Sequence, residues 1–139
     1  MGWNNMDWDN GKYLISDNKK LINVQKVQEL LSQTYWASNR TKDVITKTIN
    51  KSVCFGLYFN NSMIGFARAV TDEVVFSWIS DLVIDEHYRG RGLGKWFVRC
   101  IIEHPDLVKT RMHLATRVNR LYERYDFERF EAMRRYPVE

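Results

Sequence analysis

The sequence predicts an α/β (α+β) fold in which about four helices flank a mixed, mostly antiparallel central sheet. Two observations predict it. Hydrophobic periodicity alternates between helical and strand spacing along the chain, and 45% of the 139 residues are hydrophobic. This apolar content is sufficient for one core and excludes a disordered chain. We therefore expect a single domain over residues 1–139, with residues 1–11 as an N-terminal extension.

The first part of the chain contains a short apolar run and two helical patterns. Lys12–Ser16 is the apolar run, and Leu21–Leu31 then carries leucine and valine residues at helical spacing. Asp17 and Asn18 precede this second segment and are typical helix-capping residues. A weaker helical pattern covers Thr41–Asn50.

The middle of the chain has strand periodicity. β-Branched and aromatic residues fill Val53–Phe59 and Met63–Val70, and the polar turn Asn60–Ser62 separates them, which predicts a β-hairpin. The run Val74–Ile84 is mostly apolar on both of its alternating faces. It is therefore expected to be a central strand covered on both sides.

The last third of the chain alternates between the two periods. Leu93–Ile102 has helical spacing and is followed by His104-Pro105, which ends a helix. Met112–Thr116 is expected to be a strand, Val118–Tyr125 a short helix and Phe127–Tyr136 a last strand. This order predicts a parallel portion in the C-terminal half of the sheet.

The net positive charge comes from the C-terminal part of the chain. The chain has 21 basic and 17 acidic side chains and a net charge of +4. Residues 1–85 hold 9 of each kind, so residues 86–139 hold 12 basic and 8 acidic side chains. This asymmetry indicates either a phosphate-bearing partner or ordinary solubility.

The cysteines and the N-terminus bear on the compartment. Cys54 and Cys100 lie in segments of buried character and form no CxxC pair, so we expect reduced core thiols. The first residues lack the basic start and apolar run of a signal peptide, and no stretch approaches the roughly 20 apolar residues of a membrane span. We therefore expect a cytoplasmic protein without a membrane partner.

The most informative segment is the glycine-rich loop between the strand Val74–Ile84 and the helix that begins at Leu93. Its glycines permit a tight turn with unobstructed N–H groups, and the helix N-terminus adds a partial positive charge. Arg89, Arg91 and Lys95 add formal charges, so the segment predicts an anion-binding site. The alternative is a flexible glycine loop with solvated charges.

Two common phosphate-binding loops are excluded by spacing. A P-loop requires serine or threonine after its lysine, whereas Trp96 follows Lys95 here. A dinucleotide-binding loop requires GxGxxG, whereas Gly90–Gly94 has the pattern GxGxG. The pattern that remains is [Arg/Gln]-x-x-Gly-x-Gly, which begins at Arg89.

With this pattern the chain resembles the GNAT family of N-acetyltransferases. ISDLVIDEHYRGRGLGKWFV resembles the family's fourth strand, pyrophosphate loop and third helix, and LYERYDF resembles its LYExxGF element. Met63–Arg68 is similar to the family's third strand. The resemblance covers Tyr13 to about Phe130 and implies the GNAT fold, with acetyl-CoA as cosubstrate.

The resemblance also implies which residues bind acetyl-CoA. Backbone N–H groups of the glycine loop would bind the pyrophosphate, and the main chain before the loop would pair with the pantetheine arm like an added strand. The expected set is Leu82, Val83, Ile84, Arg89, Gly90, Arg91, Gly92, Leu93, Gly94, Lys95 and Asn119. No metal is expected, because the histidines and cysteines lack metal-ligand spacing.

Acetyl transfer to an amine defines three further roles. The amine must be neutral when it attacks the thioester, the developing oxyanion needs a donor, and the leaving thiolate needs a proton. Tyr122 matches the family tyrosine near the thiol, which predicts a general acid. Core packing is the alternative, because Tyr122 shares a helical stripe with Leu121 and Tyr125. By the same resemblance, backbone N–H groups in Leu82 and Val83 would stabilise the oxyanion.

Asp81 interrupts the apolar strand, where an unpaired carboxylate is costly to bury. One hypothesis makes it the general base, acting directly or through water. A second makes it the group that holds the substrate ammonium. The third alternative is a hydrogen-bonded aspartate with a structural role.

The acceptor side has weaker signals. Tyr35 and Trp36, in the loop after the first helix, are candidates for lining an acceptor pocket, although tryptophans are most simply core residues. Asp126 stands where the family has glycine in LYExxGF, and Arg117–Arg120 lacks the small residues often found there. The family pattern is therefore closer at the pyrophosphate end than at the acceptor end.

These observations predict an N-acetyltransferase that moves acetyl from acetyl-CoA to a primary amine of a small molecule or protein by direct attack in a ternary complex. The main alternative is a noncatalytic acyl-CoA-binding regulatory module. A nucleic-acid-binding domain is less favoured, because no aromatic residues interleave with Arg89–Arg91. The expected partners are a small-molecule or peptide amine and, for so small a chain, a second copy in a homodimer.

Overall fold

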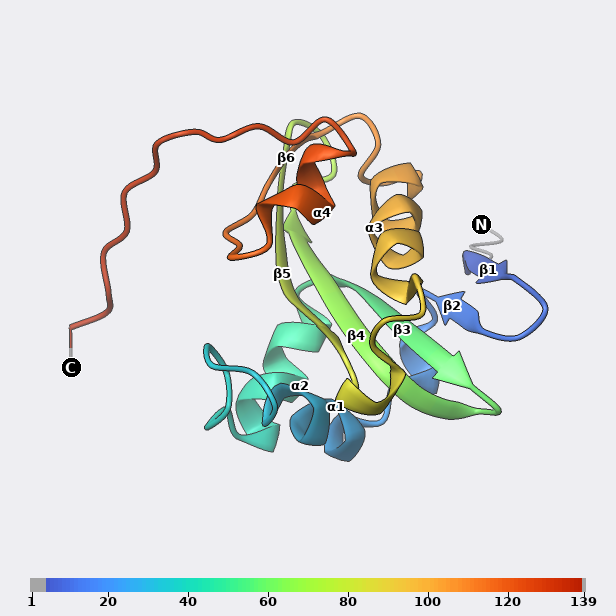
Figure 1. The fold of residues 1–139 in the computed structure, drawn as a ribbon. Helices are drawn as coiled ribbons and strands as arrows, with labels where there is room; N and C mark the ends of the chain where they lie inside the picture. Colours follow the sequence, from blue (N-terminus) through green and yellow to red (C-terminus); the bar gives the residue numbers. More distant parts are fainter. Residues whose placement is uncertain (1–4, 139) are drawn as a thin grey trace.

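The computed structural model describes residues 5–138 and contains one six-stranded sheet with strand order β1-β2-β3-β4-β5-β6 (Figure 1). Neighbouring strands are antiparallel except β5 and β6, which are parallel. The strands are β1 (Asp7–Asp9), β2 (Leu14–Ser16), β3 (Val53–Phe59), β4 (Ser62–Thr71), β5 (Phe76–Ile84) and β6 (Arg111–His113). The helices are α1 (Val24–Leu31), α2 (Lys42–Asn50), α3 (Leu93–Glu103) and α4 (Asn119–Glu123), with short 3-10 turns η1 (Lys19–Leu21) and η2 (Glu86–Tyr88). The predicted mixed, mostly antiparallel sheet with flanking helices is confirmed.

Helices cover both faces of the sheet and enclose two hydrophobic clusters (Figure 1). On one face, Phe97 of α3 is buried in a cluster with Phe55 of β3. On the other face, Leu30 of α1 and Ile45 of α2 are buried with Phe66 of β4. Burial of each such side chain contributes about 1.5–3 kcal/mol, so both faces of the sheet stabilise the fold.

The hairpin and the second helix form where the sequence predicts them. The turn residues Asn60 and Asn61 have φ of 48° and 66°, the left-handed conformation that a tight hairpin turn needs and that asparagine tolerates. At the start of α2, the side chain of Thr41 accepts a hydrogen bond from the N–H of Val44 at 3.3 Å. This is the N-cap geometry that threonine favours.

α1 begins later than the predicted Leu21–Leu31. Asn23 caps it by accepting a hydrogen bond from the N–H of Lys26 at 3.1 Å. Asn18 caps the separate turn η1. Asp17 caps no helix, because its carboxylate contacts the buried His104 ring at 2.7 Å. Two capping asparagines in succession therefore divide the predicted helix.

β5 is a well-covered strand, as predicted, but it begins at Phe76 and not at Val74. The carboxylate of Asp72 accepts hydrogen bonds from the N–H groups of Val74, Val75 and Phe76 at 2.9–3.0 Å. These bonds form a turn that leaves the two valines 66% and 64% exposed. Because the Asp72 side chain forms this turn, the strand begins two residues later than the apolar run does.

The predicted last strand, Phe127–Tyr136, does not form. Residues 128–138 are exposed, have no regular secondary structure and extend away from the sheet (Figure 1). The Phe130 ring contacts the His113 ring of β6, with 5.3 Å between centroids, and makes no strand pairing. A strand needs a paired edge as well as suitable residues. The neighbouring β6 is itself short, since it covers Arg111–His113 and not the predicted Met112–Thr116.

The N-terminal part is described in part only. Residues 1–4 of the expected extension, residues 1–11, lie outside the described range, and Asp7–Asp9 pair with β2 as strand β1. Within residues 5–138, no helix has the length and apolar character to cross a bilayer. Cys54 and Cys100 are buried and unpaired, as predicted for core thiols, and burial raises their pKa values to about 11 and about 12.

Candidate active site

A β-bulge in β5 marks the candidate site. Phe66 of β4 pairs with Val83, but Arg68 pairs with Ser80, so β5 contains one extra residue between these pairs. Asp81 lies at this point with φ of 58°, a left-handed conformation that is uncommon outside glycine. Bulges re-aim side chains. Here the bulge turns Asp81 away from the core under α3.

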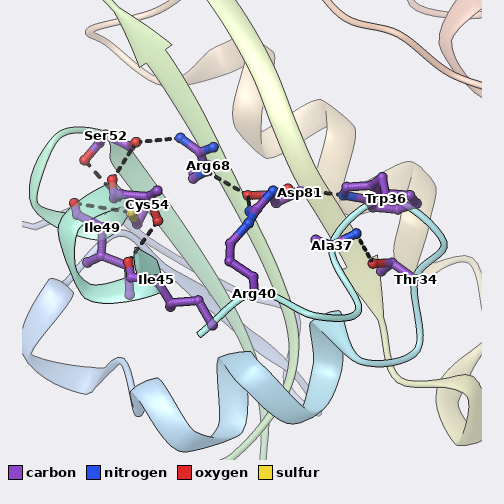
Figure 2. Close-up of polar contacts among 11 residues, drawn as sticks. Thr34, Trp36, Ala37, Arg40, Ile45, Ile49, Ser52, Cys54, Arg68 and Asp81 are labelled. Carbon is purple, nitrogen blue, oxygen red and sulfur yellow. Dashed lines mark hydrogen bonds and ion pairs between the residues drawn. The ribbon is translucent and has the colours of Figure 1, made fainter. Parts of the chain in front are cut away.

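The Asp81 carboxylate accepts hydrogen bonds from three side chains, two from the loop between α1 and α2 and one from β4 (Figure 2). Its Oδ2 accepts hydrogen bonds from Arg40 Nη1 at 2.5 Å and from Arg68 Nε at 2.7 Å. Its Oδ1 accepts a hydrogen bond from the indole N–H of Trp36 at 3.0 Å. The Asp81 side chain is only 1% exposed, so these three donors satisfy a carboxylate that is removed from solvent.

The surrounding charges keep Asp81 ionised. Burial alone would raise its pKa, but the hydrogen bond and charge of Arg68, followed by those of Arg40, outweigh burial and leave the pKa below its usual value. A carboxylate with a lowered pKa and two arginine partners accepts a proton poorly. Of the three alternatives, this geometry favours the structural, hydrogen-bonded aspartate. The role of general base stays a prediction.

The Asp81 contacts also hold the loop between α1 and α2. Arg40 and Trp36 both belong to this loop, residues 32–41, and both bond to Asp81 of β5. Thr34 tightens the same loop, because its hydroxyl accepts a hydrogen bond from the N–H of Ala37 at 3.1 Å (Figure 2). The loop therefore keeps a defined position against the end of β5.

An open cavity of about 1010 Å³ lies beside this loop and reaches α4. It exists because β5 and β6 pair only from Phe76 to Trp78, after which the chain from Leu114 onward leaves the sheet. Within residues 5–138, the main-chain edge of Leu82 therefore has no partner strand on the side of β6. The cavity is lined by Tyr35, Trp36, Arg40, Trp78, Ile79, Ser80, Asp81, Leu82, Leu114, Ala115, Thr116, Arg117, Val118, Leu121, Tyr122, Ala132, Met133, Arg134 and Tyr136.

Five predicted site residues line this one cavity: Tyr35, Trp36, Asp81, Leu82 and Tyr122. Tyr35 and Trp36 lie at its wall, 61% and 45% exposed, and are not core residues. Tyr122 of α4 also lines the cavity and is 8% exposed. Burial raises the pKa of Tyr122 above its ordinary value, so the hydroxyl carries its proton at neutral pH as an ordinary tyrosine does. Its ring also packs against Phe127, at 5.7 Å between centroids, so the packing alternative holds beside the general-acid role.

The glycine loop has the backbone that an anion-binding turn requires. Gly90 and Gly92 both have φ of 79°, and a Cβ atom built on either one would meet no atom within 4 Å. Gly92 precedes α3 without a side-chain cap, so the first N–H groups of α3 receive no acceptor from a capping side chain. Around Gly94, a Cβ atom would lie 3.8 Å from Ile84 and 3.9 Å from Leu121. The loop therefore lies next to both β5 and α4.

The predicted charged residues of the loop are partly engaged within the protein. Arg89 Nε donates to the carbonyl oxygen of Ile84 at 3.0 Å. Arg91 donates to the Tyr13 hydroxyl at 3.2 Å, while Lys95 is exposed. Asn119, predicted to contact the cofactor, begins α4 and lines a second open cavity of about 900 Å³ at the outer side of β6.

Sequence reasoning missed the cations at the cavity. Arg40 and Arg68 bond to Asp81, although they lie 41 and 13 positions from it in the chain. Arg117 stacks on the Tyr35 ring with 3.7 Å between its guanidinium carbon and the ring centroid. The sequence pattern offered one indication of these cations, namely Arg68 in an otherwise apolar strand. Arg40 and Arg117 lie in loops, where no periodic pattern indicates their contacts.

Comparison with known proteins identifies the family. The model of the family described as "Acetyltransferase (GNAT) domain" matches residues 50–129, which contain the bulge, the glycine loop and α4. This match, which covers more than half of the chain, defines an acetyltransferase domain of the GNAT type. The chain belongs to the GNAT family of acetyltransferases.

Individual relatives agree with this assignment. A Gibberella zeae protein named as an acetyltransferase is 27% identical over 117 residues, 70% of this chain and 66% of the relative. The spermine/spermidine N(1)-acetyltransferase of Bacillus subtilis (strain 168) is 34% identical over 87 residues, 52% of this chain and 57% of the relative. The chain thus spans just under two thirds and just over half of the lengths of these two relatives.

A solved structure matches nearly the whole chain. The crystal structure of a GNAT-family protein from Xanthomonas campestris pv. campestris superposes with a TM-score of 0.84 at 30% identity. The match covers 90% of this chain and 93% of that chain. The predicted GNAT fold is confirmed.

Proposed function

We propose that this GNAT domain transfers acetyl from acetyl-CoA to a primary amine by direct attack in a ternary complex. The observation that carries the proposal is the pair of left-handed glycines, Gly90 and Gly92, before the uncapped start of α3, next to the unpaired edge of β5. Backbone N–H groups and a helix N-terminus form a site for phosphate groups, and a free strand edge accepts an extended, amide-containing chain. A noncatalytic binding module would not need the acid and the acceptor cavity beside them.

The residues present fit acetyl-CoA. The space beside Gly90 and Gly92 is open, so phosphate oxygens have access to the backbone N–H groups. Leu82 lines the cavity at the free edge of β5, where the pantetheine arm would pair. When bound, acetyl-CoA supplies a thioester carbonyl that an amine can attack.

The protein's own groups would supply the remaining chemistry. The N–H groups in Leu82 and Val83, next to the bulge, would donate to the oxygen that gains negative charge. The hydroxyl of Tyr122, which is protonated at neutral pH, would donate a proton to the departing sulfur. Because Asp81 is already bonded to two arginines, water in the open cavity is the favoured route for the proton that the amine loses.

The glycine at position 94 offers a test with a matched control. Gly94 has ordinary helical backbone and room for a Cβ atom, so Gly94→Ala should fold and bind acetyl-CoA. Gly94→Asp adds a carboxylate to the first turn of α3, which favours the free helix but repels phosphate. We therefore expect Gly94→Asp to fold and to abolish the rise in melting temperature that acetyl-CoA causes.

Calorimetry would measure acetyl-CoA affinity for the wild type and both variants, and release of thiol in the presence of amines would measure turnover. Equal acetyl-CoA affinity in the wild type and Gly94→Asp would exclude the phosphate-binding role of the loop. Binding without thiol release for any amine would favour the noncatalytic module. Residence in the cytoplasm and assembly as a homodimer stay predictions.

A further inference from the structure

The cavity at the acceptor side has an excess of positive charge. Its charged lining residues are Arg40, Arg117, Arg134 and Asp81. Among the described residues that line the cavity, Asp81 is the one carboxylate. The lining therefore has three cations against one anion, and Arg68 adds a further cation directly behind Asp81.

In this arrangement, the Asp81 carboxylate is not available to bind the ammonium group of a cationic acceptor. Both of its oxygens accept hydrogen bonds from Trp36, Arg40 and Arg68, and its side chain is 1% exposed. An acceptor ammonium could reach the carboxylate only by displacing an arginine and leaving a buried charge unpaired, which is strongly unfavourable. A polyamine, which carries several ammonium groups and no anion, would therefore meet a site of its own charge sign.

Two guanidinium groups keep donors that the protein does not use. Arg40 bonds to Asp81 through Nη1 alone, and its side chain remains 22% exposed. The Arg117 guanidinium lies over the Tyr35 ring, and within residues 5–138 no carboxylate lies in ion-pair range of it. Stacking occupies the face of a guanidinium and leaves its N–H edge free. Both arginines therefore offer N–H groups beside the cavity.

A guanidinium edge matches the planar carboxylate group with two parallel hydrogen bonds. We propose that the acceptor is a small primary amine that carries a carboxylate, as in a free amino acid, and that Arg117 and Arg40 bind this carboxylate. Tyr35 and Trp36, which line the same wall, would contact its apolar part. The inference rests on the proposed acetyl-CoA-dependent acetyl transfer and adds the substrate class.

Matched amines test the charge preference directly. Each pair has the same amine with and without its carboxylate: tyrosine and tyramine, tryptophan and tryptamine, lysine and cadaverine. Spermidine tests the polyamine class, and phosphoethanolamine tests phosphate in place of carboxylate. We expect kcat/KM, measured from thiol release, to be at least tenfold higher for the carboxylate member of at least one pair, and higher than for spermidine and phosphoethanolamine.

Variants at position 117 connect the preference to the structure. Arg117→Met keeps an unbranched side chain on Tyr35 without the charge, and should lower the carboxylate preference at least tenfold through KM, with kcat little changed. Arg117→Lys keeps the charge but not the fork of donors, and should retain part of the preference. Arg99→Met removes a positive charge from an exposed position on α3 and should leave the preference intact.

The outcomes separate this inference from the proposed function. Acetylation of the decarboxylated members, spermidine or phosphoethanolamine as efficiently as the amino acids would overturn the substrate class and leave acetyl transfer standing. Absence of acetyl-CoA binding to the wild type would overturn both. If acetyl-CoA binds but no amine releases thiol, calorimetry of the same pairs in the presence of CoA decides. Equal affinities for the two members overturn the substrate class, and at least tenfold tighter binding of the carboxylate members supports it.

Discussion

Arg68 of β4 and Asp81 of β5 form a buried ion pair across two neighbouring strands, with 2.7 Å between Nε and Oδ2. The pair lies where β5 bulges, and the same Arg68 guanidinium also donates to the Ser52 hydroxyl at 3.1 Å (Figure 2). Arg40 adds a second ion pair to the same oxygen from the loop between α1 and α2. Asp81 therefore joins the sheet to the loop that lines the cavity beside Tyr35 and Trp36.

Asp81→Asn should destabilise the protein by about 3 kcal/mol at neutral pH, because it leaves two arginines without their counter-ion. The pKa of Asp81 is lowered in the folded state, so its contribution is complete above its unfolded pKa of about 3.9. The contribution is lost as the pH falls through the lower folded pKa. Denaturant unfolding of both proteins should show a constant difference at pH 6–8 that decreases only below about pH 4.

The pH dependence of activity separates the alternatives for Asp81. If Asp81 holds the loop, Asp81→Asn should raise the KM for the acceptor without shifting the pH profile of kcat. If it is the general base, kcat should fall at neutral pH and recover partly at higher pH, where more of the amine is neutral. An unchanged stability together with such a recovery would contradict the structural role.

Local sequence signals were sufficient for most of the fold. The hairpin β3–β4 depends on two neighbouring asparagines, and α2 on its own threonine cap, so both could be predicted. The boundaries of α1 and β5 could not be predicted from the apolar pattern. The side chains of Asn23 and Asp72 accept hydrogen bonds from nearby backbone N–H groups and so fix where each element begins. The predicted last strand was wrong: the neighbouring edge strand β6 covers only Arg111–His113, and no local pattern in Phe127–Tyr136 encodes the length of that edge.

The part of the candidate site that is contiguous in the sequence could be predicted, and the part that depends on distant residues could not. The glycine loop is contiguous in the sequence, and the positive φ of Gly90 and Gly92 agrees with its expected turn. The partners of Asp81 come from elements that only the topology brings together. An aspartate in an apolar strand therefore indicated that a carboxylate would be buried at a cost in free energy, but it did not identify the groups that bind it. The arginines that line the cavity were missed for the same reason, because Arg117 contacts Tyr35 from a distant part of the chain.

Tyr122→Phe should lower kcat about 10²-fold or more and leave acetyl-CoA affinity unchanged, because it removes only the proton donor. Burial raises the pKa of Tyr122, so the acid form persists above the usual tyrosine pKa of about 10. The wild type should therefore show no loss of kcat from this group up to about pH 10. Steady-state kinetics between pH 7 and about pH 10 would measure both effects.

Tyr125→Phe is the matched control for Tyr122→Phe. It removes a hydroxyl from the end of the same helical segment, where that hydroxyl donates to the carbonyl oxygen of Lys95 at 3.0 Å. We expect a small loss of stability and nearly normal kcat. Wild-type kcat in Tyr122→Phe would leave only the packing against Phe127 as the role of this tyrosine.

Asp126→Gly should stabilise the fold by about 0.5–1 kcal/mol. Asp126 ends the turn after α4 with φ of 68°, the left-handed conformation that the resemblance to the LYExxGF element predicts for this position. The N–H of Phe127 bonds to the carbonyl oxygen of Tyr122 at 3.3 Å across this turn, so the conformation is part of the helix end. Aspartate accepts it at a cost and adds a negative charge at the negative end of the helix.

Asp126→Asn separates the two causes, because asparagine removes the charge and keeps a side chain in the left-handed conformation. It should give a smaller stabilisation than glycine, and the difference between the two variants measures the backbone cost. Denaturant unfolding with and without acetyl-CoA would measure the three proteins, and the rise in stability that acetyl-CoA causes should be the same in all. A loss of stability in Asp126→Gly would mean that the Asp126 carboxylate makes a stabilising bond in solution. Since Asp126 is exposed, arginines such as Arg124 or Arg129 would then be its partners.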